Sequence, residues 1–255
     1  MKKRIIVDGL EISYIEEGEG SPVLMLHGWG CNGGHWQPLI DALKEDHLVI
    51  APDIPGFGES EEPPADWGTK DFSAFFSHFM KALDLEKAVL VGHSNGGRIA
   101  ISLAASGLGE KMILTDSAGI KPRRSASYYA KVYSYKAMKK VLSLPGLSGK
   151  KEEILEKQRN KRGSADYNAA SPTMRRILST VVNEDLSDVL AKVRVPTLLI
   201  WGSEDTATPL ADGEKMEAIL KENHVDTALI VFSGRGHFAF LEEKNRFISV
   251  CKAFI

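Results

Sequence analysis

Six short apolar runs, most of them separated by segments of helical length, constrain the fold of this chain more than any other feature. They cover residues 22–26, 48–51, 88–91, 112–114, 197–201 and 228–232. Strands without polar interruptions are typical of a parallel sheet that is covered on both faces. Helices are expected at 34–45, 70–84, 95–107, 211–222 and at the C-terminal end. This alternation predicts a doubly wound α/β sheet.

The first residues add a hairpin to this sheet. Residues 4–8 and 11–16 have the pattern of two short strands, which meet at Asp8-Gly9. An Asp-Gly pair favours a tight turn between antiparallel strands. The sequence therefore predicts an α/β fold with a mostly parallel sheet of about eight strands.

One long interval, residues 119–187, contains no strand pattern. We interpret it as a helical cap, or lid, inserted into an α/β core that consists of residues 1–118 and 188–255. Pro, Gly and Ser residues divide the interval into helical segments near 125–143, 151–160 and 172–182.

Composition excludes several classes of protein. Of the 255 residues, 43% are hydrophobic and 26% are charged, which is typical of a globular domain. The net charge of −2 argues against nucleic-acid binding through bulk charge. Cys31 and Cys251 are too few for a disulfide framework or for a zinc site built of thiols. We expect neither a metal nor another cofactor.

The chain also lacks the pattern of a targeting or membrane segment. The apolar run at residues 5–7 stops at Asp8 and is too short for a signal peptide. No apolar stretch approaches the length of a membrane span. We therefore expect a cytoplasmic protein with no integral membrane segment, and both a monomer and a homodimer remain open.

Positive charge is concentrated in the predicted cap. Residues 121–162 contain 13 Lys or Arg and 3 Asp or Glu, a local charge of +10. A solvated helical surface explains this pattern. The alternative is a surface that attracts an anionic substrate or an anionic lipid.

The pentapeptide Gly92-His93-Ser94-Asn95-Gly96 follows a predicted strand and precedes a predicted helix. In this G-x-S-x-G context a serine is held at a sharp turn, and the glycines leave the space that the turn needs. The helix N-terminus is then directed at the serine hydroxyl. Ser94 is therefore the candidate nucleophile.

A base and an acid for this serine are expected at the same edge of the sheet. His237 lies in a glycine-rich loop after the last predicted strand and is the candidate base. Asp205 follows the strand before it and is the candidate acid, with Asp116 and the neighbouring Glu204 as alternatives. The chain order Ser94, Asp205, His237 is that of a known catalytic architecture.

Two main-chain N–H groups are needed to hold an oxyanion. The N–H of Asn95, directly after the nucleophile, is one candidate, and the N–H of Trp29 in His27-Gly28-Trp29-Gly30 is the other. His27 and His93 are interpreted as neutral, hydrogen-bonded structural residues.

These motifs together resemble the α/β-hydrolase superfamily, in its capped serine-hydrolase form. The resemblance extends over residues 24–240 and includes residues 27–30, 53–60, 92–97, 201–205 and 236–238. It implies a hydrolase, most simply a carboxylesterase, that acts on a small or aromatic ester. Asp53 in the second motif is interpreted as structural.

Other activities of the superfamily remain open. Ser94 replaces the aspartate that dehalogenases and epoxide hydrolases use as nucleophile. Carbon–carbon bond hydrolases usually have asparagine where this chain has His93, but the pair Arg175-Arg176 is suited to their carboxylate substrates. An enol-lactonase, which also binds an anion, is a further alternative. A ligand receptor or regulator that retains a serine triad represents a different class.

We expect aromatic and apolar side chains to line the substrate pocket. Besides Trp29, the candidates are Trp36, Phe57, Tyr128, Tyr129, Met174 and Phe238.

Overall fold

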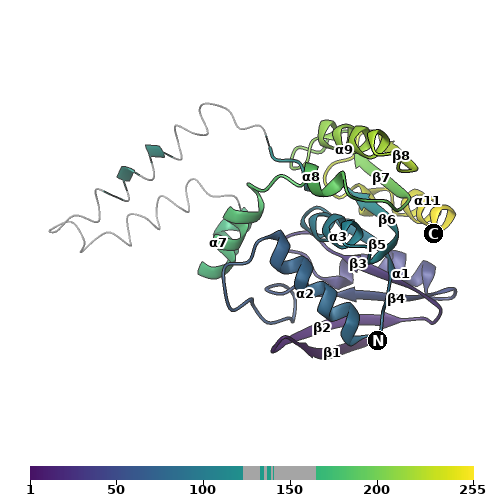
Figure 1. Cartoon of the computed structure of the whole chain (residues 1–255), viewed down its shortest axis with the longest axis horizontal. Coiled ribbons are helices and arrows are strands. Elements are labelled where there is room, and N and C mark those ends of the chain that lie inside the picture. The colour runs from purple at the N-terminus through teal and green to yellow at the C-terminus, as the bar shows by residue number, and fades with distance from the viewer. Residues whose placement is uncertain (123–132, 135–136, 139, 141–164) are drawn as a thin grey trace.

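The computed structural model describes residues 1–122, 133–134, 137–138, 140 and 165–255. In this part of the chain an eight-stranded sheet has the order β1-β2-β4-β3-β5-β6-β7-β8 (Figure 1). Only the β1–β2 and β2–β4 pairs are antiparallel. The predicted α/β fold is confirmed. The strands are β1 (Lys2–Val7), β2 (Leu10–Glu17), β3 (Ser21–Leu26), β4 (His47–Pro52), β5 (Ala88–His93), β6 (Gly109–Thr115), β7 (Thr197–Gly202) and β8 (Thr227–Phe232).

The β1–β2 hairpin turns where the Asp-Gly pair predicts it. Asp8 has a φ of 49° and Gly9 a φ of 82°, so both central residues of the turn are left-handed. This conformation matches the twist of antiparallel strands and places Val7 opposite Leu10.

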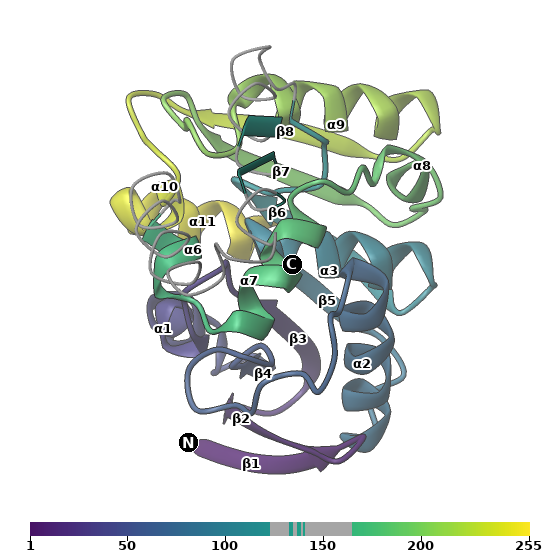
Figure 2. The same ribbon diagram turned by 90° about the vertical axis from the view of Figure 1, so that its left-hand side faces the viewer.

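Helices cover both faces of the sheet (Figure 2). One face carries α1 (Gln37–Leu43), α10 (Ala239–Glu242) and α11 (Lys244–Phe254). The other carries α2 (Thr69–Ala82), α3 (Asn95–Ala105), α8 (Ser187–Leu190) and α9 (Leu210–Glu222). Side chains of the central parallel strands alternate between the two cores, and both cores exclude water, which is why these strands are largely apolar, whereas the edge strand β1 carries three exposed basic residues. In β3, Val23 and Met25 face the first core, whereas Leu24 and Leu26 face the second.

The described residues between β6 and β7 include α6 (Ala165–Ala169) and α7 (Pro172–Val181). Helix α7 lies at the predicted 172–182, and its first turn is capped by the Ser171 hydroxyl, which accepts a hydrogen bond from the Met174 N–H at 3.2 Å. The helices predicted near 125–143 and 151–160 fall almost entirely outside the described residues.

The two ends of the interval between β6 and β7 meet in the structure. The main-chain N–H of Leu186 donates to the carbonyl oxygen of Gly119 at 2.8 Å. The side chain of Glu184 accepts hydrogen bonds from the main-chain N–H and the hydroxyl of Thr69 at the start of α2. The division into a core and a cap of residues 119–187 stays a prediction.

Candidate active site

Ser94 lies at the turn between β5 and α3 and has a strained backbone. Its φ of 50° and ψ of −117° are unusual for a residue other than glycine. A Cβ on Gly92 would lie 2.6 Å from the Cα of Gly97, and one on Gly96 would lie 2.1 Å from the carbonyl oxygen of Leu26. The glycines of the motif are therefore required by close main-chain approach.

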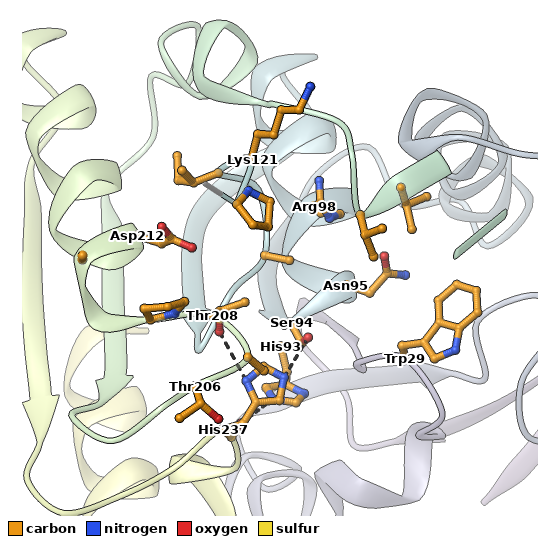
Figure 3. A pocket seen from close by; sticks show the side chains of 18 of the residues that line it. Trp29, His93, Ser94, Asn95, Arg98, Lys121, Thr206, Thr208, Asp212 and His237 are labelled. Atoms are coloured by element: carbon orange, nitrogen blue, oxygen red, sulfur yellow. Dashed lines mark hydrogen bonds between the residues drawn. The ribbon is translucent and has the colours of Figure 1, made fainter. Parts of the chain in front are cut away.

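Three side chains form a continuous series of hydrogen bonds at the carboxyl edge of the sheet. The Nε2 atom of His237 is 2.9 Å from the Ser94 Oγ (Figure 3). Its Nδ1 atom is 2.8 Å from the Asp205 Oδ2. Asp205 is 5% exposed, whereas Ser94 and His237 line a cavity. This geometry allows the imidazole to take a proton from the serine hydroxyl while the carboxylate orients the ring.

The Asp205 carboxylate is held by several donors. Its Oδ1 accepts from the main-chain N–H groups of Ala207 and Thr208, at 2.7 and 3.0 Å. Its Oδ2 accepts from the Thr208 hydroxyl at 2.7 Å as well as from His237. Burial alone would raise the pKa of Asp205, but the hydrogen bonds from His237 and Thr208 bring it below its ordinary value.

The two alternative acids are placed differently. The Asp116 Oδ1 accepts from the Gly202 N–H at 2.8 Å, and no hydrogen bond of the described residues joins Asp116 to His237. Burial raises the pKa of Asp116 to about 7, and the nearby charge of Asp205 adds to the effect. Glu204 is exposed. The geometry therefore favours Asp205 as the partner of His237.

The two other histidines near Ser94 are buried. Burial lowers the pKa of His27 to about 4 and that of His93 to about 3. His93 donates from Nε2 to the carbonyl oxygen of His237 at 2.8 Å, and His27 accepts from the Ile54 N–H at 2.8 Å. Both rings are therefore neutral at physiological pH and act as structural residues.

The loop after β3 lies against the serine. A Cβ on Gly28 would be 3.2 Å from the Ser94 Cβ and 2.7 Å from the His93 Nδ1. Asn95 is the first residue of α3, so its N–H has no acceptor within the helix. Among the hydrogen bonds of the described residues, none uses the main-chain N–H of Trp29 or of Asn95. Both groups are thus available beside Ser94.

A cavity of about 890 Å³ opens above Ser94. This volume is within the range of small-molecule sites. Trp29 and Phe238, two of the candidate pocket residues, lie among the residues that line it. Further apolar lining comes from the loop after β6, from the C-terminal end of α7 and from the segment that leads into the first turn of α9. These residues are Ala118, Ile120, Pro122, Leu178, Val181, Val182, Ala207, Pro209 and Ala211.

Three predicted pocket residues do not line this cavity. Trp36 is 1% exposed and packs on Phe240 and Phe247, in the core on the opposite face of the sheet. Phe57 packs edge-on against Trp29, with ring centroids 4.8 Å apart. Met174 is 2% exposed and belongs to the core beneath α7. The assignment of Trp36 to the pocket is wrong, because a strand–helix pattern does not tell which side of the sheet a loop residue faces. Phe57 and Met174 belong to the core on the same side of the sheet as the cavity, but they are turned toward other core side chains.

Other predicted residues lie outside the cavity or outside the described part of the chain. Tyr128 and Tyr129 are not among the described residues, and most of the basic interval 121–162 is not either. Arg175 donates to the carbonyl oxygens of Tyr167 and Asn168, and Arg176 forms an ion pair with Asp66 at 2.7 Å. Neither arginine lines the cavity, so neither supports binding of an anion there.

Several cavity residues were missed by sequence reasoning. Thr208 lies three residues after Asp205, and its hydroxyl contacts both Asp205 and His237. Arg98, four residues after Ser94 on α3, and Asp212 on α9 bring charge into the cavity. The spacing from a catalytic residue is a usable signal for Thr208 and Arg98, because both lie on the element that positions that residue.

The described residues contain no group of three or more His, Cys, Asp or Glu side chains arranged to hold a metal ion. Within the same part of the chain, no helix combines the length and the apolar character that crossing a membrane requires.

The fold and the site define a hydrolase. The model of the alpha/beta hydrolase family matches residues 23–250, and the chain belongs to this family.

Similar proteins include enzymes with different substrates. The chain is 26% identical over 262 residues to a pimeloyl-[acyl-carrier protein] methyl ester esterase of Legionella pneumophila, covering 96% of this chain and 100% of the relative. It is 31% identical over 264 residues to a 2-hydroxy-6-oxo-6-phenylhexa-2,4-dienoate hydrolase of Comamonas testosteroni, covering 92% and 88%. The structure of an esterase from Exiguobacterium antarcticum superposes with a TM-score of 0.75 at 26% identity and covers 100% of this chain and 99% of that one.

Proposed function

We propose that this protein is a serine hydrolase that cleaves carboxylic esters through an acyl-enzyme intermediate. The observation that carries the proposal is the hydrogen-bond series from Ser94 through His237 to Asp205, with distances of 2.9 and 2.8 Å. The similarity to two ester hydrolases supports the ester as the substrate class.

In the first half of the reaction, the Ser94 Oγ attacks the carbonyl carbon and His237 Nε2 takes the hydroxyl proton. The tetrahedral oxyanion accepts hydrogen bonds from the N–H groups of Trp29 and Asn95. His237 then gives its proton to the leaving alcohol oxygen as the carbon–oxygen bond breaks, and the acyl group stays on Ser94.

In the second half, His237 takes a proton from water, and the resulting hydroxide attacks the acyl carbon. The second tetrahedral intermediate collapses, the acid leaves, and Ser94 recovers its proton from His237. Asp205 stays ionised throughout and stabilises the protonated imidazole. The low pKa of Asp205 is compatible with this role.

The shape of the cavity supports a small or aromatic ester. Trp29 and Phe238 provide aromatic surface next to the serine, and Ile120 and Val181 provide aliphatic surface beyond it. We expect burial of apolar groups of the substrate here to contribute about 25 cal/mol for each Å² removed from water.

Hydrolysis of the p-nitrophenyl esters of acetate, butyrate and octanoate tests the proposal. Wild type is expected to turn over at least one of them, and Ser94→Ala is expected to turn over none. A fluorophosphonate should add one phosphonyl group to wild type, detected by mass spectrometry, and none to Ser94→Ala. Turnover that persists in a folded Ser94→Ala variant would show that the reaction does not use this serine.

The acid is tested separately. Asp205→Asn is expected to lower kcat by about four orders of magnitude, as the same change does in another serine triad. Asp116→Asn is expected to cost far less. A larger loss from Asp116→Asn would assign the role to Asp116.

A second candidate is hydrolysis of a carbon–carbon bond in an anionic substrate. The similarity to the Comamonas testosteroni hydrolase and the buried Arg98 in the cavity favour it. Turnover of carboxylate-bearing dienones, with no turnover of esters by the same preparation, would establish this candidate in place of the first.

A further inference from the structure

The end of the cavity away from His237 is polar. Arg98, Lys121 and Asp212 lie there (Figure 3), and Lys215 also lines the cavity. Arg98 is four residues beyond Ser94, which is about 6 Å along the axis of α3. The polar end is therefore close enough to be reached by the same small molecule that places its carbonyl at Ser94.

The Arg98 side chain is buried, and most of its N–H groups have no acceptor among the described residues. Arg98 is 3% exposed, and its one side-chain hydrogen bond to a described residue goes from Nη1 to the carbonyl oxygen of Glu184 at 3.3 Å. A guanidinium has five N–H donors, and an arginine as buried as this one is normally paired. Burial lowers its pKa to about 10, despite the nearby charges of Glu184, Asp185 and Asp212.

Asp212 faces the same space from α9. Its carboxylate points into the cavity in Figure 3, and no hydrogen bond or ion pair of the described residues uses it. Burial raises the pKa of Asp212, and the charges of Lys215 and Arg98 oppose that rise. The charge of each residue shifts the pKa of the other, yet no ion pair within 4.0 Å joins Asp212 to Arg98 among the described residues. A buried donor and a half-buried acceptor therefore face the cavity as neighbours without a direct contact.

We propose that Arg98 and Asp212 form a subsite for an amide group of the substrate, the carbonyl oxygen of the amide accepting from Arg98 and its N–H donating to Asp212. This assignment rests on the proposed ester hydrolysis and names its substrate class: an ester with an amide a short distance from the scissile carbonyl.

The chemistry of the two side chains selects this group over its competitors. A carboxylate satisfies Arg98 but is repelled by Asp212, and an ammonium group has the opposite conflict. A methyl group leaves the remaining donors of Arg98 and the carboxylate of Asp212 without a partner, which is costly in a buried site. An amide presents one acceptor and one donor within a single rigid plane. Lys121 and Lys215 are exposed, so water and salt screen their charges.

The first experiment compares esters with wild type. One series consists of methyl esters whose acyl chain ends, after about three to six methylene groups, in a carboxamide, a carboxylate or a methyl group. A second series carries the same three ends on the alcohol. In at least one series kcat/KM is expected to be about tenfold higher for the amide than for the methyl compound of equal length, and higher than for the carboxylate.

Variants assign the preference to the two residues. In Arg98→Met and in Asp212→Ala the ratio of kcat/KM for amide and methyl compounds is expected to approach one. Asp212→Ala is further expected to improve the relative turnover of the carboxylate compound, because the repulsion is removed, whereas Arg98→Met is not. Matched controls are Arg194→Met and Asp226→Ala, since both residues are exposed and lie outside the cavity. Melting temperatures identify any variant that fails to fold.

Binding to Ser94→Ala separates the subsite from the proposed reaction. Calorimetric titration with the amide and methyl esters needs no turnover, and tighter binding of the amide supports the subsite even if no ester is hydrolysed. Equal or weaker binding of the amide, a wild-type preference for the carboxylate, or an amide preference that survives both Arg98→Met and Asp212→Ala would each overturn it. If binding favours the amide and no ester is turned over, the proposed ester hydrolysis fails alone.

Discussion

Replacement of Thr208 by valine removes a hydroxyl that contacts both the proposed acid and the proposed base of the site. Its hydroxyl lies 2.7 Å from the Asp205 Oδ2, 2.9 Å from the Asp116 carbonyl oxygen and 3.3 Å from the His237 Nδ1. The hydroxyl has one proton, and the ionised Asp205 is the strongest of these acceptors. Valine has nearly the same shape and donates nothing.

The loss has a predictable effect on pH dependence. A hydrogen bond to a charged group contributes about 1.5–3 kcal/mol. Its removal raises the pKa of Asp205 and leaves His237 as the only donor to Oδ2, so the carboxylate holds the protonated imidazole more tightly. About 1.4 kcal/mol corresponds to one unit of pH, so the lost hydrogen bond is equivalent to about one to two units at Asp205. Since only part of this change is passed on to the neighbouring imidazole, we expect the acid limb of kcat/KM to move up by about half to one unit.

The assay is the pH profile of kcat/KM for p-nitrophenyl butyrate between pH 5 and pH 9. Thr208→Ser keeps the hydroxyl and is the control, with an expected profile close to that of wild type. The loss of a buried hydrogen bond of about 1.5–3 kcal/mol should also lower the melting temperature of Thr208→Val by about 3–12 °C, at about 2–4 °C for each kcal/mol. A lower melting temperature with an unchanged acid limb would refute the reasoning, because Thr208 would then act only on stability.

Three further predictions follow from buried groups. Burial raises the pKa of Asp116 to about 7, so the folded protein holds the carboxyl proton more tightly than the unfolded chain does. The free energy of unfolding therefore decreases as the pH rises from about 4 to about 7. Asp116→Asn removes this decrease, so the difference in melting temperature between the variant and wild type should change in favour of the variant from pH 5 to pH 8. The same difference at both pH values would contradict the raised pKa of Asp116. Trp36→Ala should lower the free energy of unfolding by about 3–5 kcal/mol in a denaturant titration while KM for p-nitrophenyl butyrate stays unchanged; a raised KM would return Trp36 to the pocket. Gly28→Ala places a Cβ 2.7 Å from the His93 Nδ1 and should lower kcat by about a hundredfold with a native circular-dichroism spectrum; unchanged kcat would show that the loop tolerates displacement.

The fold was predictable because its signals are local. Each apolar run is a strand, and the Asp8-Gly9 pair alone predicts the turn of the hairpin. The elbow at Ser94 was equally readable, since the glycines on both sides have a steric reason that depends only on the strand and helix next to it.

Choices between spatial alternatives were not predictable in this way. Asp116 and Asp205 both follow parallel strands at the same edge, so position along the chain cannot distinguish them. Side-chain direction does, because Asp116 turns to the Gly202 N–H and Asp205 to His237. The prediction that Trp36 lines the pocket was wrong for a related reason. An aromatic residue near the loop after β3 was equally compatible with the cavity and with the core on the opposite face of the sheet.

Charges in the cavity were missed because the sequence shows charge but not burial. Arg175 and Arg176 stand out as a pair in the sequence. In the structure Arg175 donates to main-chain carbonyl oxygens and Arg176 forms an ion pair with Asp66. Arg98 is a single basic residue within an apolar helix and gives no such pattern, although it is the arginine that the cavity buries.

The hydrogen bond between Gly119 and Leu186 joins the two points at which the chain leaves and re-enters the neighbourhood of the sheet. Because these points touch, β6 and β7 are held together at the base of the interval, whatever its length. Helix α7 lies within the interval but buries Met174, Ile177 and Val181 in the core. Exchange of residues between Gly119 and Leu186 for a segment of another sequence must therefore preserve these three core contacts.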